Sequence, residues 1–99
     1  MNMPGLRRNF MLIVIGFLVV DKVANQYNID VLAENFDSKC EEVLDIFVEN
    51  GLIEPKEKEI IMRIIQKIKE HIIQMRVLAK MREQELLQSL ALFQKILFS

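Results

Sequence analysis

The longest uninterrupted helical pattern in this chain runs from Pro55 to Phe98 and takes up nearly half of its 99 residues. Pro55 suits the first turn of a helix, where its missing N–H is not needed, and no Gly or Pro follows it. The mean spacing along one face is about 3.6 residues, the period of a straight helix, which favours packing in a bundle over a long left-handed coiled coil. That face is mostly apolar and consists of Ile61, Ile65, Ile68, Ile72, Met75, Ala79, Arg82, Leu86, Leu90, Phe93 and Leu97.

The length of this helix is too great for a compact domain of the same chain. At 1.5 Å per residue it would measure roughly 65 Å, whereas a compact domain of this size is only about 35 Å across. We therefore expect a bend or break in the polar segment 80–85, or a C-terminal third that meets a partner. Four apolar side chains on one face of that third form the expected association interface: Leu86, Leu90, Phe93 and Leu97.

Composition predicts an ordered, all-α fold. Hydrophobic residues make up 52% of the chain, there are only three Gly and two Pro, and no internal repeat is evident. Disorder, barrels and solenoids are disfavoured on these grounds. The patterns predict three helices, roughly 6–26, 31–50 and 55–98. We expect residues 1–27 to form an apolar N-terminal helix and residues 28–99 to form a helical hairpin with a very long last helix.

The hairpin is predicted by the segment between residues 28 and 54. Asp30 is a candidate N-cap, and Ser38 begins a capping-box pattern with Glu41. The helix therefore either starts near residue 31 or restarts near residue 38, with residues 30–36 as a separate turn. Gly51 suits the residue just past a helix C-terminus. The connection to Pro55 is short, so the two helices should run antiparallel.

Charge is distributed unevenly although the net charge is only −1. Residues 28–54 hold eight acidic side chains and one basic one, and residues 55–99 hold nine basic and five acidic ones. This asymmetry predicts that the acidic helix lies against the basic one. The acidic face, which includes Glu34, Glu41 and Asp45, is either solvated or docked on the long helix or on a basic partner. The basic excess is too small and scattered to indicate nucleic-acid binding.

The run from Phe10 to Val20 is uncharged and follows two arginines. A buried helix is the favoured interpretation, because eleven residues are fewer than the roughly 20 needed to span a bilayer. A membrane segment is the second. A signal peptide is disfavoured because no small-residue cleavage site follows the run closely. A buried strand is disfavoured because the sequence offers no second strand to pair with it. The expected buried or membrane-facing side of this helix consists of Phe10, Ile13, Phe17 and Val20.

No catalytic, cofactor or metal motif is present. The single histidine, His71, lies at the edge of the apolar stripe, and the single cysteine, Cys40, lies on the apolar face of the middle helix. A boundary histidine and a buried thiol are the simplest interpretations, because a metal site or a nucleophile needs further converging groups. One cysteine permits no intrachain disulfide. We therefore expect a protein that is not an enzyme and has no cofactor.

The sequence as a whole predicts an interaction or assembly protein that forms homo-oligomers through apolar helix faces, with another protein as a further partner. The alternative is a small helical scaffold anchored in a membrane by residues 10–20, and a nucleic-acid-binding helical protein ranks third. The expected location is cytoplasmic or membrane-associated, without a clear signal for secretion.

Overall fold

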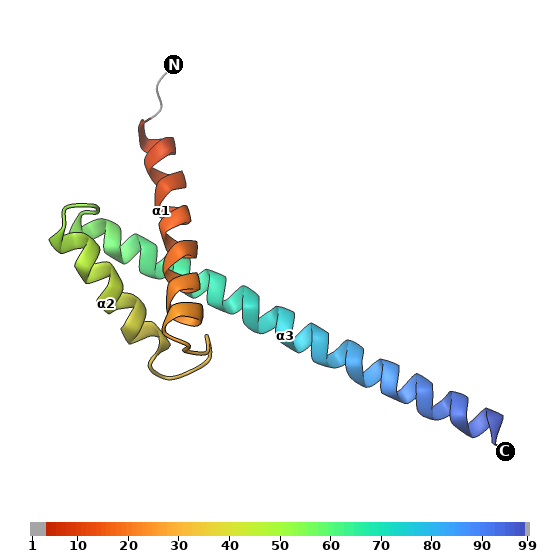
Figure 1. The fold of residues 1–99 in the computed structure, drawn as a ribbon. Helices are drawn as coiled ribbons and strands as arrows, with labels where there is room; N and C mark the ends of the chain where they lie inside the picture. The colour runs from red at the N-terminus through yellow and green to blue at the C-terminus, as the bar shows by residue number, and fades with distance from the viewer. Residues whose placement is uncertain (1–3, 99) are drawn as a thin grey trace. The chain divides into compact units, whose positions relative to one another are not determined.

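The computed structural model describes residues 4–98. Three α-helices follow one another, α1 (Pro4–Asp21), α2 (Phe36–Glu49) and α3 (Pro55–Leu97), and the described residues contain no strand (Figure 1). The predicted all-α fold, with an apolar first helix and a very long last one, is confirmed. A π-helical turn, η1 (Lys22–Gln26), extends α1. By compactness the chain forms two units, Met1–Lys69 and Glu70–Ser99, a boundary that the sequence patterns did not indicate.

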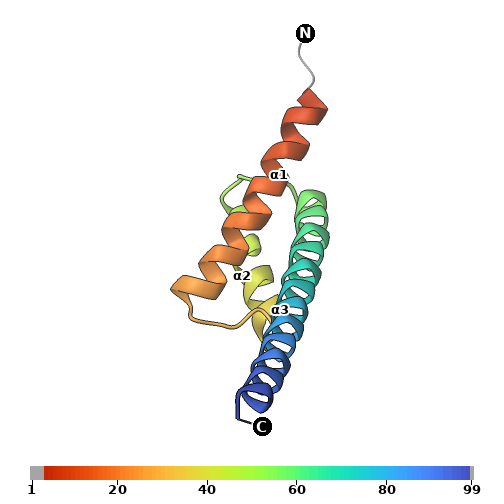
Figure 2. The same cartoon turned by 90° about the vertical axis from the view of Figure 1, so that its right-hand side faces the viewer.

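The core of the N-terminal unit lies between α1, α2 and the first four turns of α3, as two views at right angles agree (Figures 1 and 2). Its fully buried side chains come from all of these elements: Leu12, Val19, Val23, Phe36, Cys40, Leu44, Ile61 and Ile65. In both α2 and α3 the buried positions recur every three or four residues. Burial therefore follows the helical period on which the prediction of these two helices rested.

The hairpin of α2 and α3 is antiparallel, as the sequence predicted. Lys58 lies 2.6 Å from Asp45 and 3.1 Å from Glu41. Lys69, about three turns further along α3, pairs with Asp37 in the first turn of α2. The start of α3 therefore lies beside the end of α2, and a later part of α3 lies beside the start of α2. The expected contact between acidic and basic helices occurs within this hairpin.

The turn after α2 is closed by Gly51, whose φ of +72° lies in the left-handed region. Its N–H donates to the Val48 carbonyl at 3.1 Å, and the Leu52 N–H donates to the Phe47 carbonyl at 3.0 Å. These two bonds form a Schellman motif, in which glycine is favoured because a Cβ is strained at such a φ. The predicted role of Gly51 is therefore confirmed.

The predicted caps at the start of α2 were wrong. The Asp30 carboxylate accepts from the Leu32 N–H at 2.8 Å and shapes a turn six residues before the helix. Ser38 lies inside the first turn of α2, and its hydroxyl donates to the Asn35 carbonyl at 3.1 Å. Residues 31–35 form turns, in agreement with the expectation of a separate turn over residues 30–36, and α2 begins at Phe36, between the two expected starts. Local hydrogen bonds of short polar side chains compete with capping, which explains both errors.

The long helix α3 is unbroken from Pro55 to Leu97, including the polar segment 80–85. The sequence predicted either a bend or break in that segment or a C-terminal third that meets a partner, and no break is observed. The residues that follow Lys69 belong to the C-terminal unit. The described part of this unit consists of α3 from Glu70 to Leu97, followed by Phe98.

Candidate association surfaces

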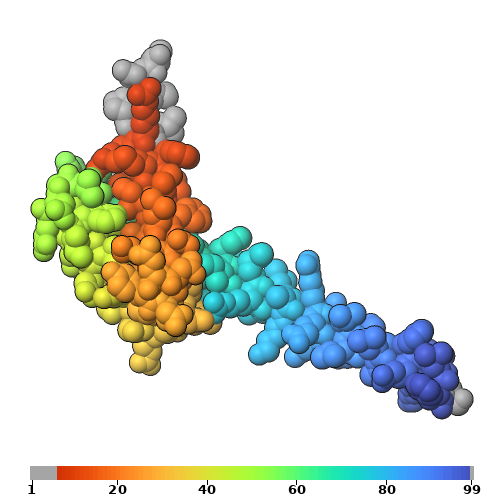
Figure 3. Space-filling view, viewed as in Figure 1, coloured from red at the N-terminus to blue at the C-terminus, as the bar shows by residue number. Residues whose placement is uncertain are grey.

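The C-terminal unit exposes its apolar side chains. From Gln74 to Phe98 every side chain is exposed, including the four predicted for association: Leu86 (62%), Leu90 (50%), Phe93 (59%) and Leu97 (60%). Figure 3 shows the C-terminal part of the chain, drawn in blue, as a narrow body one helix wide. Burying a side chain of this kind is worth about 1.5–3 kcal/mol, so a row of them strongly favours a covered state. We call the face formed by Ile72, Met75, Ala79, Leu86, Leu90, Phe93 and Leu97 the distal stripe.

A second exposed apolar surface lies on α1. Phe10 (68%), Ile13 (42%) and Phe17 (56%) are exposed, whereas Val20 (7%) is buried. We call the exposed side, formed by Phe10, Ile13, Val14, Phe17 and Leu18, the α1 outer face. The side of α1 that packs inside the unit consists of Leu12, Gly16, Val19 and Val20, and Val23 of η1 is buried beyond it. Three of the four residues predicted for a buried or membrane-facing side therefore share the side that the unit leaves open.

Gly16 sets the close packing of α1 on α3. A Cβ placed on Gly16 would lie 2.9 Å from Cγ2 of Ile64 and 3.8 Å from Cδ1 of Ile68. Ile64 is β-branched and therefore stiff in a helix, so it has little freedom to move away. The glycine at this position thus allows the two helices to approach and fixes which side of α1 faces inward.

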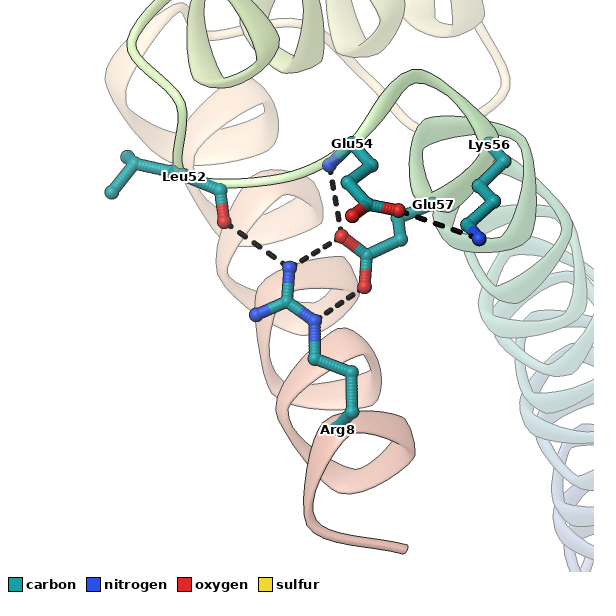
Figure 4. Close-up of polar contacts among 5 residues, drawn as sticks. All are labelled: Arg8, Leu52, Glu54, Lys56 and Glu57. Carbon is teal, nitrogen blue, oxygen red and sulfur yellow. Dashed lines mark hydrogen bonds and ion pairs between the residues drawn. The ribbon is translucent and has the colours of Figure 1, made fainter. Parts of the chain in front are cut away.

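Arg8 and Glu57 join the start of α1 to the first turn of α3 (Figure 4). The Arg8 guanidinium donates through Nε and Nη2 to the two carboxylate oxygens of Glu57, and Nη2 also donates to the Leu52 carbonyl at 3.3 Å. Glu57 accepts a further bond from the Glu54 N–H at 2.8 Å, which caps α3. The hydrogen bonds from Arg8 and, to a smaller extent, from Glu54 lower the pKa of Glu57 from 4.5 to about 2.

Sequence reasoning missed this ion pair. Its two residues are 49 positions apart, and a pairing over that distance leaves no periodic trace. A local signal did exist, because a glutamate at the third helical position reaches back to cap the helix start. The residue before α3 is Glu54 rather than serine or threonine, so the sequence does not contain the usual capping-box pattern.

The predicted docking acids divide into two groups. Glu41 and Asp45 both pair with Lys58 and raise the pKa of its ammonium, whereas Glu34 is exposed in the turns before α2. A shallow, open hollow beside this contact is lined by both charged and apolar residues: Glu41, Pro55, Lys58, Glu59, Met62 and Arg63. Two of the three acids thus have their basic partner within the chain.

The chemically reactive side chains do not gather into a site. Cys40 is fully buried, and burial raises the pKa of its thiol to about 11, which disfavours the nucleophilic thiolate. His71 is exposed. Within residues 4–98, no three side chains of the His, Cys, Asp and Glu types converge in a way that could hold a metal ion.

Among the residues that the structure describes, one helical stretch, Arg7–Gln26, is long and apolar enough to cross a membrane. Core helices of soluble proteins and signal sequences share these properties, so the stretch alone does not fix a location. No protein-family model, curated protein or solved structure matches the chain.

Proposed function

We propose that this protein is a non-enzymatic assembly protein that self-associates through the distal stripe of α3. One observation carries the proposal: every side chain from Gln74 to Phe98 is exposed, although this segment holds most of the large apolar residues of α3. An exposed apolar surface of this extent is typical of an interaction site. A helix surface of this kind is also a common docking element, in which apolar residues at helical spacing enter a partner's groove.

A second copy of the chain is a suitable partner because the charges of this segment are nearly balanced. Residues 70–98 contain four basic side chains, Arg76, Lys80, Arg82 and Lys95, and three acidic ones, Glu70, Glu83 and Glu85. Two copies therefore meet without strong electrostatic repulsion, whereas a highly charged partner gains little.

Light scattering on the untagged full-length protein, without detergent, tests this function. We expect a defined oligomer for the wild type and for a control carrying Gln88→Glu and Ala91→Glu, which lie on the opposite side of the helix. The matched variant, Leu90→Glu with Phe93→Glu, adds the same charge to the distal stripe and should be monomeric. Truncation after Glu85 should also give a monomer. A wild-type monomer, or an unchanged mass for the stripe variant and the truncation, would contradict the proposal.

The α1 outer face supports a second candidate function, a membrane-anchored scaffold. Phe10, Ile13 and Phe17 are exposed on a helix that is long enough to meet a bilayer. Co-flotation with phosphatidylcholine vesicles separates the two candidates. An anchored scaffold floats with the vesicles, loses flotation when Phe10 and Phe17 are both changed to Ser, and keeps it after truncation at Glu85. A soluble assembly protein remains at the bottom of the gradient in every case.

A further inference from the structure

From Ile72 to Phe93, the distal stripe is symmetric about a point between Arg82 and Glu83. Counted outward from that point, Ala79 and Leu86 are equally distant, and so are Met75 and Leu90. The next pair, Ile72 and Phe93, follows the same rule. The spacing of the apolar residues therefore reads the same in both directions along α3. Two antiparallel copies with this midpoint in common place every one of these residues opposite an apolar residue.

The charged band in the middle of the stripe has the same symmetry. Lys80 and Glu85 are equally distant from the midpoint, as are Arg82 and Glu83, and each pair unites opposite charges. The described residues contain no ion pair that involves any of these four side chains. At about 100° per residue, Lys80 and Glu83 lie on one flank of the stripe, and Arg82 and Glu85 lie on the other.

A two-fold axis through the midpoint brings these charges together. In an antiparallel pair related by such an axis, each flank of one helix faces the same flank of the other. Lys80 then lies within one turn of Glu83 of the second copy, and Arg82 lies within one turn of Glu85 of the second copy. Both interactions occur twice, so the polar band contributes four ion pairs between the copies.

We infer that the distal stripe binds a second copy of this chain in an antiparallel arrangement, with the midpoint between Arg82 and Glu83 on the two-fold axis. This inference rests on the proposed self-association and adds its orientation and register. The apolar layers on both sides of the band supply the burial, and the band selects the register, as a polar residue in a helix seam commonly does.

Other arrangements of two copies fit less well. A parallel, in-register pair places Arg82 opposite Arg82 and Glu83 opposite Glu83, and like charges across an interface are unfavourable. It also sets Ala79 against Ala79, which leaves a gap in the seam. Sliding the antiparallel pair by seven residues places Arg82 opposite either Arg76 or Leu90. Only the central register matches the band with its own complement.

Disulfide formation between engineered cysteines tests the orientation in the full-length protein. Met75→Cys and Leu90→Cys are prepared separately, mixed in equal amounts, allowed to exchange subunits and oxidised mildly. The inferred register sets these two positions opposite each other, so the mixed disulfide should dominate the cross-linked product in non-reducing mass spectrometry. Leu90→Cys alone should cross-link weakly, because its two thiols are then about 22 Å apart along the axis and a disulfide requires Cα atoms within about 7 Å.

Two controls keep the result interpretable. The wild type, whose Cys40 is buried, should not cross-link. Ile72→Cys mixed with Phe93→Cys probes the next layer and should also give the mixed disulfide. This second pair replaces the first if the first pair of variants folds poorly.

Efficient cross-linking of Leu90→Cys alone would indicate a parallel pair and overturn the inferred orientation while leaving self-association intact. An oligomer in which neither mixture cross-links would likewise overturn the register. A monomeric wild type would refute the proposed function itself.

Discussion

At the scale of single residues, Glu57 is the one charged side chain that is buried among the residues whose exposure is described. It is 7% exposed, it lies in the first turn of α3, and it accepts hydrogen bonds from Arg8 of α1 and from the backbone N–H of Glu54. Removing one partner of a buried ion pair leaves the other charge unsatisfied. The stability of the N-terminal unit should therefore depend on the ionisation of this carboxyl group.

The pH dependence of unfolding tests the role of Glu57. Its pKa is about 2 in the folded protein and 4.5 ordinarily, so its contribution is complete above pH 4.5 and is lost as the pH falls toward 2. We expect Glu57→Gln to lower the free energy of unfolding at pH 7, and the difference from the wild type to shrink between pH 5 and about 2. Urea unfolding at fixed protein concentration measures this difference.

Glu59→Gln is the matched control, because it removes one exposed carboxyl group from the same turn of α3. It should lower the stability at pH 7 much less than Glu57→Gln does. Equal effects of the two variants at pH 7, or a Glu57→Gln effect that stays constant down to pH 2, would show that the ion pair with Arg8 does not stabilise the folded state.

At the scale of elements, the contact between α1 and α3 depends on the absence of a side chain at Gly16. In most helices a glycine is a weakness, since alanine is favoured there by about 1 kcal/mol. Here the added Cβ would lie 2.9 Å from the Ile64 side chain, and overpacking of this kind typically costs about 1–3 kcal/mol. Packing should therefore cancel or exceed the gain in helix propensity.

A double-mutant cycle separates these two effects. Gly16→Ala in the wild-type background should be neutral or destabilise the protein by about 1–2 kcal/mol. In an Ile64→Ala background, which removes the opposing methyl group, the same change should stabilise it by about 1 kcal/mol. Thermal or urea unfolding of the four proteins gives the coupling energy. A coupling near zero would mean that α1 does not pack on α3 through Gly16.

At the scale of the whole molecule, the two units differ in how their helices are stabilised. The N-terminal unit has a core of its own, in which Phe36, Leu44 and Ile61 are fully buried. In the C-terminal unit every side chain from Gln74 to Phe98 is exposed, and isolated helices are marginal in water because tertiary packing supplies most helical stability. The order of this unit should therefore depend on assembly.

Hydrogen exchange at two protein concentrations tests this dependence. Dilution below the assembly concentration should accelerate amide exchange in residues 86–97 by at least about tenfold, because the helix loses its covering partner. The amides of Leu44, Ile61 and Ile65, which belong to the N-terminal core, should change little. Slow exchange in residues 86–97 that does not respond to dilution would show that this helix is stable without a partner.

Features with a local or periodic cause could be predicted from the amino-acid sequence. The three- and four-residue spacing of apolar side chains predicted α3 and most of α2, and Gly51 marked the turn because few other residues tolerate its φ. The opposite charges of the two segments predicted their contact. The exact start of α2 was not predicted, because several short polar side chains in residues 28–38 could each begin a turn or a cap.

The buried side of α1 could not be predicted in this way, because it depends on how the helices pack together. The run from Phe10 to Val20 is apolar on every side, so its pattern contains no direction, and the inward side was selected by Gly16 fitting against Ile64. The pairing of Arg8 with Glu57 was decided in the same way, by two helices far apart in sequence meeting at one corner. The periodicity of a sequence describes one helix alone, whereas the side of that helix that becomes buried also depends on the shape of the helix packed against it.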